Sequence, residues 1–133
     1  MKVLFDYYGD VNIGLYGRAS DKLFVCSFDN DFSPILKVQQ KKISISGTEF
    51  VGLFSVMNSN GIILPFIAKE EEIRELKKIG LNVLILKENF TAIGNLIVTN
   101  DNGAIISNLI SKKSLKLIKD VLSVEVVQAT LAN

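Results

Sequence analysis

The residue types that carry out acid–base, nucleophilic and metal chemistry are sparse in this chain. Its 133 residues include no histidine and a single cysteine, Cys26. Catalysis by an imidazole base, histidine-ligated zinc sites and disulfides within the chain are therefore excluded. The carboxylates form one loose group without the spacing of a metal loop, and we interpret them as turn and cap residues: Asp6, Asp10, Asp21, Asp29 and Asp31. With no glycine-rich phosphate loop, the sequence predicts no enzyme, metal site or cofactor.

Charge and hydropathy limit the class of partner. The 15 basic and 14 acidic residues are spread evenly, and 48% of the chain is hydrophobic. A basic patch for free nucleic acid is missing, so a partner must be recognised by shape, apolar contact and hydrogen bonds. The length and composition predict a single domain. Neither a signal peptide nor a run of ~20 apolar residues is found, so we expect a protein of the cytoplasm, away from the membrane.

An internal repeat organises the chain. Residues 51–64 recur at 93–106 after a shift of 42, with the glycines and the Asn-Gly pair in register. The same shift carries the apolar residues of 73–79 onto those of 115–121, and a degenerate copy lies 38 positions earlier. We therefore predict three repeats of about 40 residues, at approximately 1–47, 48–89 and 90–133.

Each repeat is expected to form a strand, a tight turn, a strand, a helix and a strand. The pairs at 60–61 and 102–103 predict type I′ hairpins. A helix is expected from the glutamates at 70–72 to the lysines at 77–78, with Gly80 ending it. Ser111 is a plausible N-cap of another helix, whose buried side carries Leu115, Ile118, Val121 and Leu122. A short helix is expected around 31–38, and closing strands near 42–46, 82–87 and 124–129. Such α/β units must pack on their neighbours.

The repeat carries a resemblance to a known family. Residues 52–65, 91–107 and 120–126, together with the start at 12–14, resemble the translation initiation factor 6 family of archaea and eukaryotes. The resemblance covers nearly the whole chain in the same order, and the segment 91–107 is its most specific part. It implies a pentein-type α/β propeller, in which five quasi-equivalent repeats close a ring.

The resemblance also implies a function. Members of that family bind the subunit-joining face of the large ribosomal subunit, beside the ribosomal protein uL14 and near the sarcin–ricin loop of the large-subunit rRNA. They sterically prevent premature association with the small subunit and act in large-subunit biogenesis, without catalysis. The expected protein is thus a ribosome anti-association factor of the protein biosynthesis machinery.

Two sets of residues are candidates for the ribosomal contact. Leu15, Leu53 and Asn95 follow the first glycine of each repeat and are expected on one face at similar radius. The alternative is that the leucines are ordinary strand residues and the asparagine satisfies the local backbone. The hairpin loops add a second set, whose chemistry is also explained by turn geometry: Asn58, Asn100 and Asp101.

Two further features have a functional and a structural interpretation. The lysines at 112, 113, 116 and 119 could touch rRNA phosphates, although such a face is more often merely solvated. Cys26 aligns with apolar strand positions and is expected to be a small buried hydrophobe, because no histidine is available to activate it as in the pentein-fold enzymes.

Three repeats depart from the five of the family. The chain is expected to be a fragment, or its ring is completed by a second chain or by copies of itself, since open ends expose strand edges and apolar surface. The rival function is a self-associating structural or scaffold module without a ribosomal role.

Overall fold

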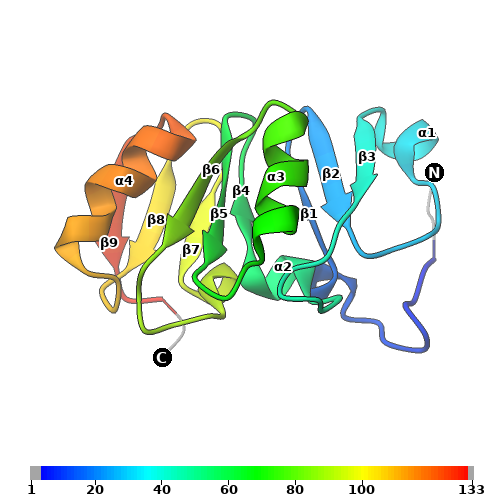
Figure 1. Cartoon of the computed structure of the whole chain (residues 1–133), viewed down its shortest axis with the longest axis horizontal. Coiled ribbons are helices and arrows are strands. Elements are labelled where there is room, and N and C mark those ends of the chain that lie inside the picture. Colours follow the sequence, from blue (N-terminus) through cyan, green and yellow to red (C-terminus); the bar gives the residue numbers. More distant parts are fainter. Residues whose placement is uncertain (1–3, 132–133) are drawn as a thin grey trace.

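A computed structural model describes residues 4–131, and within that range the strands form three separate three-stranded sheets (Figure 1). The first sheet contains β1 (Gly17–Ala19), β2 (Leu23–Cys26) and β3 (Gln39–Lys42). The second contains β4 (Val56–Met57), β5 (Gly61–Pro65) and β6 (Asn82–Leu86). The third contains β7 (Ile97–Thr99), β8 (Ala104–Ser107) and β9 (Val126–Ala129). The sheets stand side by side in an open row, with the first at the right and the third at the left of Figure 1.

All three sheets have the same strand order and mixed pairing. The first two strands form an antiparallel hairpin, and the third returns parallel to the second after a crossover. In the second sheet Val56 pairs with Ile63, and in the third sheet Val98 pairs with Ile105, which is the predicted shift of 42. The α/β class is confirmed, and each sheet has the expected sequence of elements.

The helices follow the capping signals of the sequence. Helix α3 (Glu70–Lys78) begins with three glutamates and ends with two lysines, and Gly80 takes a φ of +93° just beyond it. Helix α4 (Lys112–Leu122) begins after Ser111, as predicted. Helix α1 (Ser33–Leu36) is a single turn with Pro34 near its start, and it is shorter than the crossover helices of the other two sheets.

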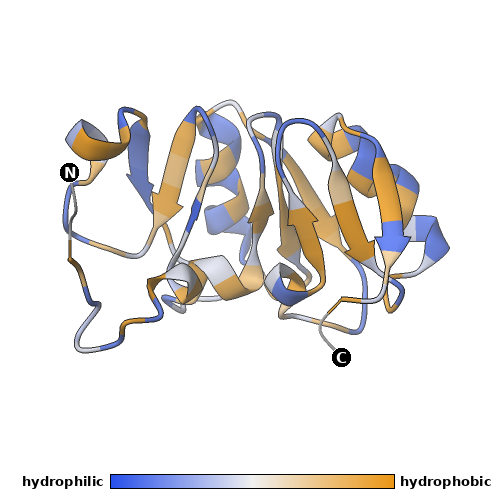
Figure 2. Ribbon diagram, turned by 180° about the vertical axis from the view of Figure 1, so that it is seen from behind, coloured by the Kyte–Doolittle hydropathy of each residue, from blue (hydrophilic) through white to orange (hydrophobic). Residues whose placement is uncertain are grey.

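The core lies between the sheets and the two long helices. Every residue of β5 is buried, because this strand packs on both faces. Ile62 and Leu64 contact the cluster that contains Leu76 of α3, while Ile63 belongs to the cluster that contains Ile118 of α4. In Figure 2 most strands are apolar, β3 is hydrophilic, and α3 and α4 carry both apolar and hydrophilic residues. Helix α4 is thus shared between the third sheet and the second.

Carboxylates fasten the connectors between sheets to the helices. Glu72, at the start of α3, accepts hydrogen bonds from the amides of Ser46 (2.8 Å) and Gly47 (2.9 Å) in the connector after β3. Glu88, in the connector after β6, accepts hydrogen bonds from the hydroxyls of Ser111 and Ser114 at the start of α4 (2.5 Å each). Burial alone would raise the pKa of both carboxyls, but the hydrogen bonds together outweigh it and lower both pKa values.

Two details of the predicted hairpins and strands were wrong. Gly61 and Gly103 do not have a positive φ, so neither loop is a type I′ turn. A Cβ on Gly61 would instead lie 2.4 Å from the carbonyl oxygen of Val121, which means that this glycine is required by close packing against α4. The closing strand of the first sheet is Gln39–Lys42, because residues 45–48 form a turn in which Ser46 and Gly47 have positive φ.

Within residues 4–131, no helix is long and apolar enough to cross a membrane.

Candidate functional site

A helical turn precedes the first strand of each sheet (β1, β4 and β7), at positions where the sequence predicted strand. We call these first strands the inner strands. The turns are η1 (Ile13–Leu15), α2 (Val51–Phe54) and η2 (Ile93–Asn95), and α2 contacts both of the others. Leu15 and Leu53 lie in these turns, so the alternative interpretation of both as ordinary strand residues is wrong. The turns close locally, because the amides of Tyr16 and Leu96 bond to the carbonyls three residues earlier. In Figure 1 the turns gather at the lower end of the strands.

Glycines bring these turns into backbone contact. A Cβ on Gly52 would lie 1.8 Å from the carbonyl oxygen of Gly14, and a Cβ on Gly94 would lie 2.4 Å from that of Gly52. Any side chain at Gly52 or Gly94 would overlap the backbone of the neighbouring turn. The repeated glycine that marks the sequence is thus a packing requirement between units.

Arg18 of β1 joins the turns from the inside. Its Nη2 donates hydrogen bonds to the carbonyls of Gly52 (2.7 Å) and Gly94 (3.2 Å), and its Nε donates to the carbonyl of Ser55 (2.9 Å). Burial lowers the pKa of this guanidinium, which remains a cation because an arginine titrates far above neutral pH. One side chain therefore connects the first sheet to α2 and η2, the entry turns that precede the second and third sheets.

Sequence reasoning missed Arg18, although a signal was present. Its equivalents in the second and third copies are Val56 and Val98, both apolar. A charged residue at a position that is otherwise apolar in the repeat indicates either exposure or a dedicated set of partners. The partners here lie on other units, so the residue types alone could not identify them.

The first set of candidate residues lies in the three helical turns. Asn95 is exposed, and within residues 4–131 its side chain makes no hydrogen bond. Leu53 is half-buried on α2, which contacts the turn η2 that carries Asn95. Leu15 is half-buried as well and packs against the aromatic cluster around Tyr16 and Phe28. A ribosomal contact by the three residues stays a prediction.

The second set lies at the opposite end of the inner strands. Asn58 is buried, and its Nδ2 donates to the carbonyls of Asn100 (3.2 Å) and Leu122 (2.8 Å). Its Oδ1 accepts hydrogen bonds from the amides of Asn60 and Gly61. Asn58 therefore closes its own loop and caps the end of α4. This burial leaves it little surface for a partner.

Asn100 and Asp101 are the exposed members of this second set. Asp101 accepts hydrogen bonds from the amide (2.7 Å) and hydroxyl (2.6 Å) of Ser59, in the hairpin loop of the second sheet. The bond from the Ser59 hydroxyl is the largest cause of the lowered pKa of Asp101. The loops line a hollow of about 360 Å³. The six candidates thus divide between the helical turns at one end of the inner strands and the hairpin loops at the other end. Their binding role stays a prediction.

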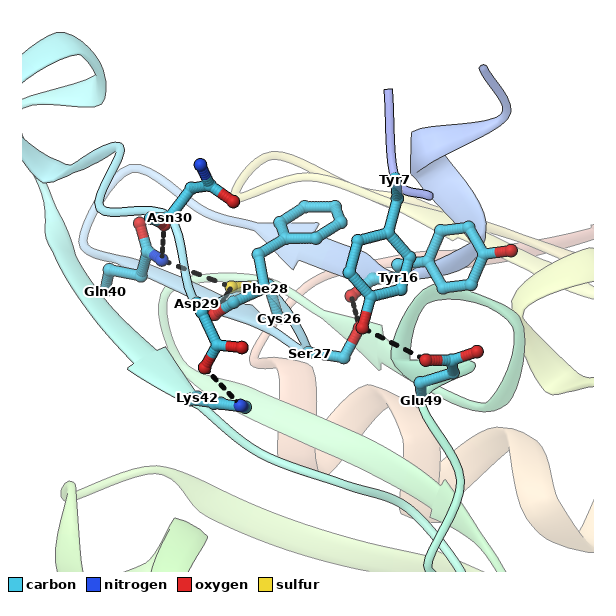
Figure 3. A network of polar contacts seen from close by, with 10 residues as sticks. All are labelled: Tyr7, Tyr16, Cys26, Ser27, Phe28, Asp29, Asn30, Gln40, Lys42 and Glu49. Atoms are coloured by element: carbon cyan, nitrogen blue, oxygen red, sulfur yellow. Dashed lines mark hydrogen bonds and ion pairs between the residues drawn. The ribbon is translucent and has the colours of Figure 1, made fainter. Parts of the chain in front are cut away.

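The remaining potentially reactive side chains lie in the first sheet and in the segments beside it (Figure 3). Cys26 is fully buried, and burial raises the pKa of its thiol. The prediction of a small buried hydrophobe is confirmed. Tyr7 donates to Glu49 (3.0 Å), and Tyr16 donates to Asp10 (2.6 Å), which raises the pKa of Tyr16 to about 12. The first bond ties the N-terminal segment to the connector before α2, and the second ties it to Tyr16 of the aromatic cluster.

The acidic and basic side chains behave as surface and turn residues. Asp6, Asp10 and Asp31 accept hydrogen bonds from backbone amides two or three residues ahead, as predicted. Among residues 4–131, no group of three or more potential ligands is arranged to hold a metal ion. The four lysines of α4 are exposed, and Lys119 pairs with Glu125 (2.8 Å).

Comparison with known proteins identifies the family. A protein of Methanothermobacter thermautotrophicus named translation initiation factor 6 is 38% identical over 130 residues, covering 93% of this chain and 59% of the relative. Its namesake in Thermoplasma acidophilum is 39% identical over 127 residues, covering 91% and 58%. The namesake in Methanocaldococcus jannaschii is 41% identical over 109 residues, covering 77% and 47%. This chain therefore spans about three fifths of the length of the first two. Because the sequence matches the eIF-6 family over residues 3–133, which include all three sheets, the chain belongs to the eIF-6 family.

Proposed function

We propose that this chain binds the large ribosomal subunit and blocks its association with the small subunit. The surface it would occupy is the subunit-joining face, next to uL14 and the sarcin–ricin loop, and the same binding would serve large-subunit biogenesis in the cytoplasm. Membership of a family whose relatives are named translation initiation factor 6 supports a role in translation. The observation that carries the proposal is the contact between α2, which carries Leu53, and η2, which carries Asn95.

The surface formed by these turns suits steric occlusion. Backbone contact at Gly52 and Gly94 fixes the spacing of the turns, and the hydrogen bonds from Arg18 hold them from inside. A surface held in this way loses little conformational entropy when it binds, so it can occupy a partner in one orientation. No chemical step is required, because the blocked fraction of subunits follows from occupancy alone.

The proposal is tested by co-sedimentation of the purified chain with large ribosomal subunits from an archaeon, followed by a subunit-joining assay. We expect the chain to pellet with large subunits and to lower the yield of joined ribosomes in proportion to occupancy. Asn95→Glu and Leu53→Glu place a carboxylate on the proposed contact surface, and each should weaken binding at least ~10-fold, because an unpaired charge is then buried.

The matched control is Leu117→Glu. Leu117 is 51% exposed on α4, away from the helical turns, so the same charge should leave binding unchanged. Equal weakening by all three variants would show a nonspecific charge effect and contradict the proposed face. A chain that does not sediment with large subunits, but forms larger assemblies of its own, would favour the rival scaffold function.

A further inference from the structure

The guanidinium of Arg18 has one nitrogen that the fold does not use. Its Nε and Nη2 donate to three backbone carbonyls, but within residues 4–131 its Nη1 forms no hydrogen bond. In the same part of the chain, no side-chain nitrogen or oxygen is both sealed from solvent and unpaired, so Nη1 faces open space. The two hydrogens on this nitrogen are therefore available to a ligand.

Arg18 also has no counter-ion among the described residues. The ion pairs that the structure contains between positions 4 and 131 do not include it. Burial lowers the pKa of the guanidinium, and no carboxylate of that range opposes the shift. A half-buried cation that meets only carbonyl dipoles attracts an anion more strongly than a solvated surface arginine does.

A hollow of about 210 Å³ lies beside this side chain, and we call it the Arg18 hollow. Residues of all three inner strands line it, among them Ala19 of β1, Met57 of β4 and Thr99 of β7. Among the described residues that line it, Arg18 alone is charged. Since about 10–15 Å³ is enough for one water, the Arg18 hollow has room for a small anion with some of its water.

The free edge of β1 supplies backbone donors to the Arg18 hollow. This strand lies at the edge of its sheet and pairs with β2 alone. The amide of Ser20 bonds to Leu23 and that of Ser27 bonds to Tyr16, on either side of the paired segment. Because antiparallel bonds alternate along a strand, the residues at positions 17 and 19 turn their amides away from β2. Both of these residues line the hollow.

The free edge of β7 is arranged in the same way. The amide of Ser107 bonds to Leu96 and that of Asn100 bonds to Gly103, so the residues at positions 97 and 99 turn their amides away from β8. They too line the Arg18 hollow. The carbonyls of these edge residues face the same side, and the positive charge of Arg18 decides which sign of ligand is favoured.

We propose that the Arg18 hollow binds one small oxyanion, a phosphate or a carboxylate, through Nη1 of Arg18 and the amides of the inner strand edges. Hydrogen bonds between a guanidinium and an oxyanion are charge-assisted, and both classes of ion accept them. The bound ion would neutralise the partly buried cation and connect the edge of β1 to that of β7. Occupancy should therefore also raise the thermal stability of the chain.

The test is an NMR titration of the 15N-labelled chain with sodium phosphate and, separately, with sodium acetate, in which sodium chloride keeps the ionic strength constant. We expect saturable shifts of the amides at positions 17, 19, 97 and 99 and of the Nε–H signal of Arg18. The dissociation constant should be on the order of millimolar, as suits an ion with few atoms. Tighter binding of phosphate or of acetate identifies the class of the ligand.

Val98→Asp is the decisive variant. Val98 lines the Arg18 hollow and is 60% exposed, so an aspartate there places a negative charge near the guanidinium without opening the core. It should weaken binding of either ion at least ~10-fold. Val127→Asp is the matched control, because Val127 is 62% exposed on the same sheet but does not line the hollow. This control should bind as the parent chain does.

Arg18→Met removes the cation itself, and it should abolish the saturable shifts if circular dichroism shows that the variant folds. Val98→Asp retains the hydrogen bonds of Arg18, so it decides the question even if Arg18→Met does not fold.

Three results would overturn the proposal. The first is the absence of saturable shifts at the four amides, and the second is an equal response to sodium chloride alone. The third is equal weakening by Val98→Asp and Val127→Asp, which would show that only the overall charge attracts the ion. The titration contains no ribosomes, and its outcome does not bear on ribosome binding.

Discussion

The guanidinium of Arg18 donates a hydrogen bond to the carbonyl of Gly94, 3.2 Å away and 76 positions later in the chain. The same nitrogen donates to Gly52, so one side chain in the first sheet holds the entry turns of the second and third. A cation among backbone carbonyls forms stronger hydrogen bonds than a neutral donor would, which suits a position where burial opposes the charge. The alignment of the helical turns therefore depends on a residue outside them.

We predict that Arg18→Met destabilises the chain by about 3 kcal/mol, because it removes charge-assisted hydrogen bonds and leaves three carbonyls without their donor. Denaturant unfolding followed by circular dichroism measures the free energy of unfolding. Arg74, the other arginine of the chain, is exposed on α3, so Arg74→Met should change stability by less than about 0.5 kcal/mol. Similar losses in both variants would contradict a special role for Arg18.

A pair of glycine substitutions tests the close approach of the turns. A Cβ on Gly52 would overlap the carbonyl oxygen of Gly14, whereas a Cβ on Gly14 meets nothing within 4 Å. We expect Gly52→Ala to cost at least about 3 kcal/mol of unfolding free energy through forced backbone movement, and Gly14→Ala to cost little. Thermal unfolding of the two variants is the measurement. Equal stability would mean that the turns separate without cost.

Glu72 should make stability depend on pH in the acid range. Its pKa is lower in the folded chain than in the unfolded chain, so its contribution is present above the unfolded value of about 4.3 and is lost as pH falls through the folded value. Relative to the parent chain, Glu72→Gln should lose about 1 kcal/mol near neutral pH and progressively less as pH falls below about 4. Chemical unfolding at several pH values checks this.

Glu71→Gln provides the control for that experiment. Glu71 is exposed in the first turn of the same helix, and its substitution removes an equal charge near the helix N-terminus. Its effect should therefore report the helix dipole alone. A loss as large as that of Glu72→Gln, with the same pH profile, would show that the connector contacts contribute nothing.

Asn58 offers a test of the loop end. Both hydrogens of its amide point at carbonyls, those of Asn100 and Leu122. Asn58→Asp replaces this donor with a carboxylate that faces two acceptors, and we expect a loss of about 2 kcal/mol or more. The same change at exposed Asn102 should have little effect. Unfolding curves that coincide for the two variants would exclude the capping role of Asn58.

Local signals in the sequence were sufficient to locate most elements. The shift of 42 predicted equivalent strand pairs, and the glutamates, lysines and Gly80 around α3 predicted its bounds, because capping and dipole effects act within a few residues. The burial of Cys26 followed from the apolar residues at the equivalent positions of the other two repeats. The resemblance to one family was also carried by the sequence alone.

What tertiary structure decided lies between the units. It replaced strand by helical turns at Leu15 and Leu53, and it made Gly61 a contact with α4 instead of a turn residue. It gave Arg18 its partners and separated the six candidate residues into two ends. These outcomes depend on contacts between residues tens of positions apart, which no local pattern encodes.

The exposure of equivalent apolar residues in the second and third sheets illustrates the same division. Sequence alone makes Ile63 and Ile105 equivalent apolar positions in equivalent strands. Only the packed chain makes the first 0% and the second 46% exposed, because α4 lies over one and no described helix lies over the other. Residue type determines what a strand can bury, while burial itself requires a neighbouring element to remove the strand from water.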